Sequence, residues 1–237
     1  MLNRQVVLKR HPQGIPLPED FDLVEGAIAQ PTEGQMLVRN LFFSLEAAIR
    51  GWLDGKANYF EPIPLGGAIR GPSVARVVES HLSGFEAGDL IFGLHHWEDY
   101  SLSDANTVLL SKLSPEPDIP LSYYSGGLGG SGHTAYVGLH EIGKIQAGET
   151  VLISAAAGAT GSMATQIAKL RGCNVVGIVG SDEKAELLTN TLGADAAVNY
   201  KTCADLATAI SQACPEGVDV YFDNVGGTTL NAALACM

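Results

Sequence analysis

A short apolar run, a turn of small residues and a helical pattern follow one another between Thr150 and Gly172, and this stretch constrains the fold more than any other. Residues 150–154 (Thr-Val-Leu-Ile-Ser) are typical of a short buried strand, and residues 155–161 are Ala, Gly or Thr throughout. From Ser162 apolar residues recur at helical spacing, and Gly172 fits a C-terminal cap. Such a unit predicts a site for the pyrophosphate of a dinucleotide, because backbone N–H groups at the helix N-terminus can approach the phosphates without intervening side chains.

The glycine spacing differs in one place from the usual Gly-x-Gly-x-x-Gly, since Ala156 stands where the first glycine is expected. The stretch downstream completes an alternating pattern, with apolar runs that predict strands at 174–179, 196–198 and 218–222 and helical patterns at 182–192 and 203–213. We therefore expect an α/β fold with a parallel, doubly wound Rossmann sheet, whose ligands lie at the carboxyl ends of its strands. Four candidate residues fall at these ends: Gly158, Ser181, Tyr200 and Asn224.

The first half of the chain has a different pattern. Short apolar runs at 35–42, 73–79 and 89–94 are separated by turns that contain Pro and Gly, which is typical of an irregular β-rich domain. A proline-rich segment at 113–120 predicts the boundary, so we expect a β-rich domain over 1–120 and a nucleotide-binding domain over 121–237. Within the second domain a helix is expected from about His133, with Tyr136 packing it against the sheet.

Composition excludes several classes of function. The formal net charge of −12 argues against binding to nucleic acid or to an anionic membrane surface. No apolar run reaches the length of a membrane span, and the first residues do not resemble a signal peptide. The four cysteines have no C-x-x-C spacing, which argues against a disulfide framework and favours a reducing cytoplasmic location.

Together these motifs resemble the medium-chain dehydrogenase/reductase superfamily, and within it the zinc-independent prostaglandin reductase/leukotriene hydroxydehydrogenase group of alkenal and enone reductases. The resemblance covers essentially the whole chain and implies a GroES-like fold for the β-rich domain. It rests on segments in the family's order, including 88–93 (Gly-Asp-Leu-Ile-Phe-Gly), 154–162, 180–184 (Gly-Ser-Asp-Glu-Lys), 199–202 (Asn-Tyr-Lys-Thr) and 221–227.

No metal site is expected. Catalytic zinc needs Cys, His or carboxylate ligands that converge from the substrate domain, and residues 1–120 contain no cysteine. His95 and His96 are adjacent, so in a strand their side chains point to opposite faces and favour ordinary core and surface roles.

The second predicted strand ends in Gly180 and Ser181, whereas NAD enzymes place an Asp or Glu there to bind the ribose 2′-hydroxyl. Lys184 is the nearby cation, and Tyr200 matches a family position. NADPH is therefore the expected cofactor, with Ser181, Lys184 and Tyr200 around its 2′-phosphate and Thr134 and Asn224 near its nicotinamide end. The full set of expected cofactor residues is Thr134, Ala156, Gly158, Ala159, Thr160, Gly161, Gly180, Ser181, Lys184, Tyr200 and Asn224.

The resemblance implies hydride transfer to the carbon–carbon double bond of a small apolar α,β-unsaturated ketone or aldehyde. Such a reaction needs a donor to the carbonyl oxygen, which in the family is a ribose hydroxyl and a tyrosine. Residues 46–48 read Glu-Ala-Ala where the family has Asp-Pro-Tyr, so that tyrosine is absent. Tyr59 is the candidate that replaces it, its alternative role being to cover the pocket, and Arg50 is expected to be a structural ion-pair partner.

The sequence ends at Met237, whereas the resemblance implies two further strands, a returning segment and a dimer-forming edge in full-length, homodimeric members. We therefore expect a Rossmann domain truncated after its fourth strand, with an unpaired sheet edge. Two alternative functions stay open at this point. One is an NADPH quinone reductase, which fits the missing tyrosine, and the other is a non-catalytic NADPH-binding protein or truncated inactive form.

Overall fold

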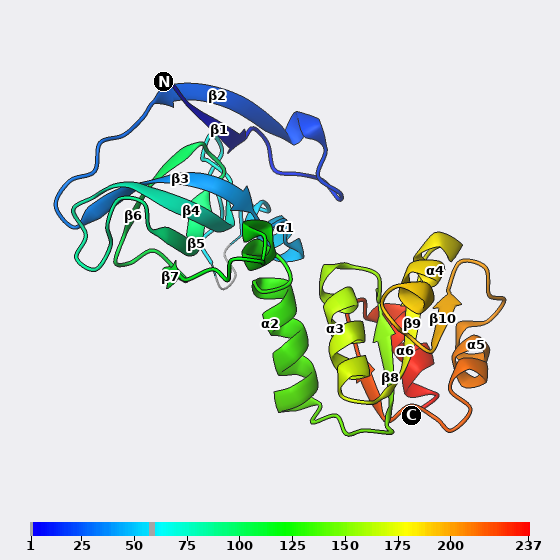
Figure 1. Ribbon diagram of the computed structural model, residues 1–237. Coiled ribbons are helices and arrows are strands. Elements are labelled where there is room, and N and C mark those ends of the chain that lie inside the picture. Colours follow the sequence, from blue (N-terminus) through cyan, green and yellow to red (C-terminus); the bar gives the residue numbers. More distant parts are fainter. Residues whose placement is uncertain (1, 57–59) are drawn as a thin grey trace. The chain divides into compact units, whose positions relative to one another are not determined.

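The computed structural model describes residues 2–56 and 60–237 of the chain (Figure 1). The chain divides into two compact units, Met1–Ser125 and Gly126–Met237. Among the described helices, none combines the length and the apolar character needed to cross a bilayer.

The first unit is rich in β-strands, as the sequence predicts, and its strands pair antiparallel. Strands β1 (Leu2–Leu8) and β2 (Phe21–Ala27) form a two-stranded sheet. A five-stranded sheet has the order β6-β3-β4-β5-β7. Its strands are β3 (Gln35–Phe43), β4 (Arg70–Ser80), β5 (Leu90–His96), β6 (Tyr100–Asp104) and β7 (Ser111–Leu113). The described residues of this unit also form the short helices η1 (Pro18–Asp20), α1 (Ala47–Trp52) and η2 (Leu121–Ser125).

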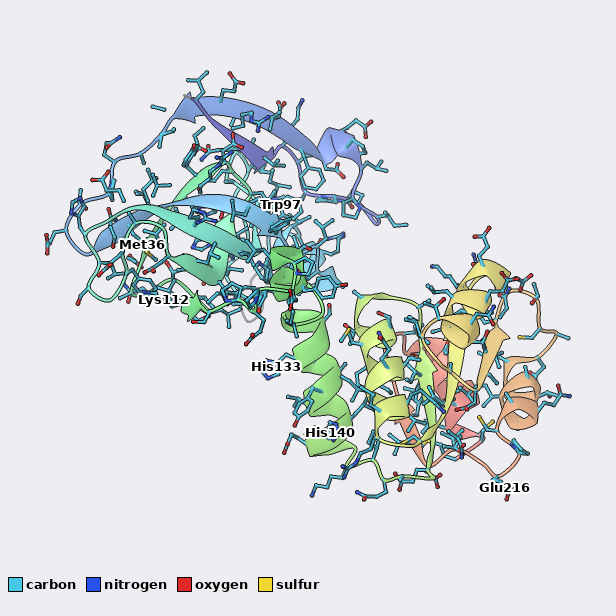
Figure 2. The ribbon with its side chains drawn as sticks, in the orientation of Figure 1. Met36, Trp97, Lys112, His133, His140 and Glu216 are labelled. Atoms are coloured by element: carbon cyan, nitrogen blue, oxygen red, sulfur yellow. The ribbon has the colours of Figure 1, made fainter. Side chains whose placement is uncertain are left out.

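Two buried clusters hold this unit together. One lies on the large sheet around Met36, Val38 and Ile91. The other joins β1 and α1 through residues such as Leu8 and Trp52. Figure 2 marks Met36 on β3 and Trp97, which follows β5.

The second unit is a parallel sheet of order β10-β9-β8-β11 covered by helices. Its strands are β8 (Thr150–Ser154), β9 (Asn174–Val179), β10 (Ala196–Asn199) and β11 (Val220–Phe222). Its helices are α2 (Gly130–Tyr136), η3 (Val137–Ile142), α3 (Ala159–Leu170), α4 (Asp182–Asn190), α5 (Leu206–Ala213) and α6 (Gly227–Leu234).

Both faces of the parallel sheet are buried. Val151 and Ile153 of β8 point into a core with α3 and α4, whereas Leu152 between them points into a core with α5 and α6. Because side chains alternate along a strand, this arrangement requires a continuous apolar run, and residues 151–153 supply it. The predicted α/β fold, a β-rich domain followed by a Rossmann sheet, is confirmed.

Candidate cofactor site

The turn between β8 and α3 leaves the helix N-terminus open. Gly158 is the N-cap residue of α3 and has no side chain to bond the first N–H groups of the helix, which belong to Ala159, Thr160 and Gly161. The turn itself is closed by backbone bonds, from Gly158 N to Ala155 O (2.8 Å) and from Ser162 N to Gly158 O (2.8 Å). These orphan N–H groups and the positive end of the helix dipole form an anion-binding geometry.

Gly161 lets the helix approach the turn closely. A Cβ at this position would lie 2.7 Å from Ala156 Cα and closer still to the carbonyl oxygen of Ala155, so any side chain would displace backbone. Gly161 therefore serves close packing, one of the roles of glycine in this motif.

Ala156, where the usual motif has glycine, is accommodated by a glycine on the neighbouring strand. Ala156 is fully buried, and a Cβ on Gly177 of β9 would lie 2.8 Å from Ala156 Cβ and would also clash with Leu188 of α4. The extra methyl group of Ala156 thus takes the space that Gly177 leaves empty. Sequence reasoning missed Gly177, although a lone glycine inside an apolar strand is a signal of close approach.

The ends of β9 and β10 bring the predicted 2′-phosphate residues into one region. Ser181 is the N-cap residue of α4, and its hydroxyl accepts a hydrogen bond from Lys184 N (3.3 Å). Tyr200 is half exposed and lies against Gly180, where a Cβ would come within 3.0 Å of the phenol oxygen. A side chain on Gly180 would therefore push the tyrosine ring away from the strand end.

A cavity of about 860 Å³ opens over these elements within the second unit. Four of the predicted residues line it, namely Gly158, Gly180, Lys184 and Tyr200. Sequence reasoning did not assign several other residues that line the cavity. They come from the loop after β10 and the start of α5 (Lys201, Asp205, Leu206 and Ala207), from the loop after β11 (Val225), and from α6 and its C-cap (Thr228, Thr229, Asn231, Ala232 and Ala235). The lysine beside Tyr200 was a visible signal, whereas the α6 residues were not, because helix orientation decides their exposure.

Asn224 and Asp223 hold the strand ends together. The Asn224 side-chain nitrogen donates to the carbonyl oxygen of Ser154 (2.8 Å), and the Asn224 backbone N–H donates to Ser154 Oγ (2.8 Å). Asp223 Oδ1 accepts from Ser154 Oγ, from the Tyr221 hydroxyl and from the N–H groups of Val225 and Gly226. Burial alone would raise the pKa of Asp223, but these donors outweigh it and lower the pKa, while burial raises the pKa of Tyr221 to about 12.

Thr134 lies elsewhere on the second unit. It is exposed on α2, which packs against α3, and it does not line the described cavity.

The expectation that Tyr136 packs this helix against the sheet is wrong, because its side chain is 51% exposed and its ring centroid lies 4.7 Å from that of His140. Gly138 instead makes the contact with the sheet, against Phe222 of β11. Figure 2 shows His133 and His140 on the continuous helix formed by α2 and η3.

The two adjacent histidines of β5 face opposite ways, as expected. His95 is buried between the hydroxyls of Ser73 (2.7 Å from Nδ1) and Ser103 (3.2 Å from Nε2). His96 is exposed, with Nδ1 3.6 Å from Glu98 Oε1. Within residues 2–56 and 60–237, no group of three or more His, Cys, Asp and Glu is placed to hold a metal ion.

The substrate-side predictions have mixed outcomes. Tyr59 lies outside the described residues. Arg50 is a structural partner, as predicted: it pairs with Asp54, and Nε donates to the carbonyl oxygen of Gly14 (2.8 Å). Ala48, at the position of the family tyrosine, is partly buried against the cluster around Trp52.

A β-rich unit followed by a parallel sheet of this order, with an open helix N-terminus beside a cavity, defines a two-domain nucleotide-binding protein. Residues 4–110 match a family described as the N-terminal domain of oxidoreductase, and residues 159–237 match one described as zinc-binding dehydrogenase. The chain belongs to the medium-chain dehydrogenase/reductase superfamily, in its zinc-independent group of enone and alkenal reductases, which confirms the resemblance.

Individual relatives agree with this assignment. The NADPH-dependent curcumin reductase of Escherichia coli (strain K12) is 40% identical over 98% of this chain and 66% of that protein. The 2-alkenal reductase (NADP(+)-dependent) of Nicotiana tabacum is 42% identical over 99% of this chain and 69% of that protein. The crystal structure of CurA in complex with NADPH from Vibrio vulnificus has a TM-score of 0.89 and 38% identity, over 99% of this chain and 68% of that one. The chain thus spans about two thirds of the length of the curated relatives it matches.

Proposed function

We propose that the protein is an NADPH-dependent, metal-free oxidoreductase that reduces the carbon–carbon double bond of α,β-unsaturated ketones or aldehydes by hydride transfer. The cavity of the second unit carries this proposal, because it is lined by the small-residue turn, by the end of β9, by Lys184 of α4 and by Tyr200, which follows β10. The names of its relatives, which include a curcumin reductase, a 2-alkenal reductase and a (+)-pulegone reductase, support the same reaction class.

The residues present fit NADPH. The cavity volume of about 860 Å³ lies within the range of small-molecule and cofactor sites. The N–H groups of Ala159, Thr160 and Gly161 are assigned to the pyrophosphate. Because Gly161 has no Cβ, the start of α3 lies close to the turn and these N–H groups lie beside it. Ser181, Lys184 and Tyr200 are assigned to the 2′-phosphate. Bound in this way, the cofactor supplies the hydride of the reaction.

Thr134 and Asn224 are assigned to the nicotinamide end. The hydrogen bond from Asn224 to Ser154 gives the asparagine a second, structural purpose, because it ties the ends of β8 and β11 together. A substitution of Asn224 would therefore alter the strand ends as well as any contact with the cofactor.

Reduction of an enone places negative charge on the carbonyl oxygen and requires a proton at the alpha carbon. We assign Tyr59 as the hydrogen-bond donor and residues 1–120 as the substrate domain, with residues 121–237 binding the cofactor. The replacement of the family tyrosine by Ala48 supports a donor from another position, and Tyr59 is the candidate. A tyrosine is suited to this role because its hydroxyl is both a donor and a source of a proton.

Ala48 also favours one alternative, an NADPH quinone reductase. A quinone takes up the hydride without needing a proton delivered to an alpha carbon, so such an enzyme can lack the tyrosine. Steady-state turnover of 4-phenyl-3-buten-2-one and of 1,4-benzoquinone with NADPH separates the two. Faster turnover of the enone, lost in Tyr59→Phe, supports the proposal, and turnover of the quinone alone supports the alternative.

Replacing Lys184 with Met is expected to weaken NADPH binding about tenfold and to leave NADH binding unchanged, because the lysine pairs with a phosphate that NADH lacks. Titration of cofactor fluorescence at low and moderate salt gives both dissociation constants. The preference for NADPH should also fall as salt increases, since ions screen an exposed pair.

Lys144→Met is the matched control, because Lys144 is an exposed lysine of the same unit that does not line the described cavity. It should bind NADPH as the wild type does. Equal binding of NADPH and NADH by the wild-type chain would contradict the proposed cofactor preference.

We also propose that the protein is cytoplasmic, that it acts on a small apolar substrate, that it forms a homodimer as the resemblance implies for full-length family members, and that it binds neither nucleic acid nor membrane. All four cysteines are free, which agrees with a reducing compartment. The net charge of −12 opposes polyanionic partners. The dimer is supported by the family resemblance, and sedimentation of the protein tests it.

A further inference from the structure

The first turn of α4 carries two acids, which creates a conflict at the expected 2′-phosphate position. Asp182 and Glu183 stabilise the helix, because negative charge is favourable near a helix N-terminus. Asp182 is also only three residues beyond the end of β9, in the region where a carboxylate opposes a 2′-phosphate and favours a ribose hydroxyl. A site selective for NADPH therefore needs the Asp182 carboxylate to be directed elsewhere.

Asn199 provides that direction. It is the last residue of β10 and pairs with Val179, the last residue of β9. Its side-chain nitrogen donates to Asp182 Oδ1 at 2.7 Å. Its side-chain oxygen accepts from the backbone N–H of Lys201 at 3.1 Å. One amide group thus connects the acid that follows β9 with the loop that follows β10.

The same residue shapes the loop that carries the phosphate-facing groups. The carbonyl oxygen of Asn199 accepts from the N–H groups of Thr202 and Cys203 (both 3.2 Å), which closes a tight turn. Tyr200 and Lys201 are held within this turn, and both line the cavity together with Lys184. Of the described residues lining that cavity, Lys184 and Lys201 are the cations, and Asp182 is not among them.

We propose that Asn199 is a positioning residue for cofactor specificity: it holds the Asp182 carboxylate away from the 2′-phosphate and presents Lys201 as a second cation beside Lys184. The inference rests on the proposed function, because it assumes that this cavity takes the adenosine end of NADPH. Asn199 need not touch the cofactor, since it acts through Asp182 and Lys201. Its amide suits both bonds, as it offers a donor to the carboxylate and an acceptor to the backbone.

The test is a double-mutant cycle on cofactor binding, measured by cofactor fluorescence with NADPH and NADH as the probes. Asn199→Ala should raise the dissociation constant of NADPH about tenfold while changing that of NADH by less than about twofold, because the released carboxylate repels only the extra phosphate. Asp182→Asn in the Asn199→Ala background should restore most of the NADPH affinity. Asp182→Asn alone should have a small effect, so the two substitutions should be strongly coupled.

Asn190→Ala is the matched control, because Asn190 is an exposed asparagine at the other end of α4, and it should leave both affinities unchanged. Equal weakening of NADPH and NADH by Asn199→Ala would overturn the inference, since it would show a merely structural role. Absence of rescue by Asp182→Asn would also overturn it. A wild-type preference for NADPH that survives Asn199→Ala defeats the inference alone, whereas a wild type without any preference defeats the proposed function as well.

Discussion

Lowering the pH from 7 to 4 is expected to reduce the free energy of unfolding of the β-rich unit by about 3 kcal/mol, because His95 is buried as a neutral imidazole. The residue is 3% exposed, and both ring nitrogens contact serine hydroxyls. Burial, with a smaller contribution from the charge of His96, lowers the pKa of His95 to about 4, and Glu98 only partly opposes the shift.

The sign follows from where the proton binds. In the unfolded chain His95 has an ordinary pKa of about 6.5. Between about pH 6.5 and pH 4, His95 is therefore protonated in the unfolded state and neutral in the folded state. The stabilisation is therefore complete above about pH 6.5 and is lost progressively down to about pH 4. Acidic residues whose pKa is lowered by hydrogen bonds, such as Asp99 with Arg4, lose their contribution at lower pH than this window.

Urea titrations at several pH values measure this loss. Both tryptophans of the chain, Trp52 and Trp97, lie in the first unit, so tryptophan fluorescence reports on that unit alone. His95→Gln should flatten the pH dependence between pH 6.5 and pH 4, whatever its cost at neutral pH. His81→Gln is the control, because His81 is an exposed histidine of the same unit that does not contribute to the lowered pKa of His95, and its replacement should leave the slope nearly unchanged. An unchanged slope in His95→Gln would refute the assignment.

The second unit was largely predictable from its sequence, because local signals agree with the tertiary structure there. The strands at 150–154 and 174–179 are confirmed at both ends, since each is a continuous apolar run that the sheet buries on two faces. Ser181 is the N-cap residue of α4, as predicted, because a serine hydroxyl can accept a hydrogen bond from the N–H three residues on. Helix starts were predicted less accurately. The helical pattern was recognised only from Ser162, because the small residues before it show no periodicity, whereas α3 begins at Ala159. The helix predicted at 203–213 begins at Leu206, because Asp205 caps it.

The first unit was predicted only as a class. Strand β2 is almost entirely exposed, so no burial pattern marks it, and its pairing with β1 joins residues such as Leu2 and Ala27 that are far apart in the sequence. The buried position of His95 likewise depends on two serines from other strands, Ser73 and Ser103. Pairings of this kind depend on register, which a single strand sequence does not reveal.

The candidate site divides in the same way. The sequence alone predicts that four lining residues lie in one region, because parallel strands end at one edge of the sheet: Gly158, Gly180, Lys184 and Tyr200. The hydrogen bond from Asn199 to Asp182 could not be predicted, since it requires particular side-chain rotamers at the end of β10 and at the start of α4. The space that Gly177 leaves for Ala156 could not be predicted either, because only the three-dimensional structure shows that β9 and the turn lie in contact there.

Replacing Gly161 with Ala is expected to destabilise the second unit by about 3 kcal/mol and to abolish NADPH binding. The new Cβ would meet Ala156 Cα at 2.7 Å and the Ala155 carbonyl oxygen at a still shorter distance, and both are backbone atoms that no rotamer change can move. Overpacking of this kind costs about 1–3 kcal/mol, and the upper value applies here because the start of α3 must shift as a whole. The displaced helix would no longer present its N–H groups to the pyrophosphate.

Gly158→Ala is the comparison that separates stability from binding. Its Cβ would contact only the Ala155 carbonyl oxygen, at 3.1 Å, and the backbone of Gly158 (φ −79°, ψ 176°) suits any residue. Gly158 lines the cavity, so the added methyl group should obstruct the cofactor while the unit stays folded. Thermal unfolding followed by circular dichroism, together with NADPH fluorescence, tests both variants. A Gly161→Ala protein as stable as Gly158→Ala would show that the turn yields more easily than its contacts imply, and undiminished NADPH binding by both variants would place the pyrophosphate elsewhere.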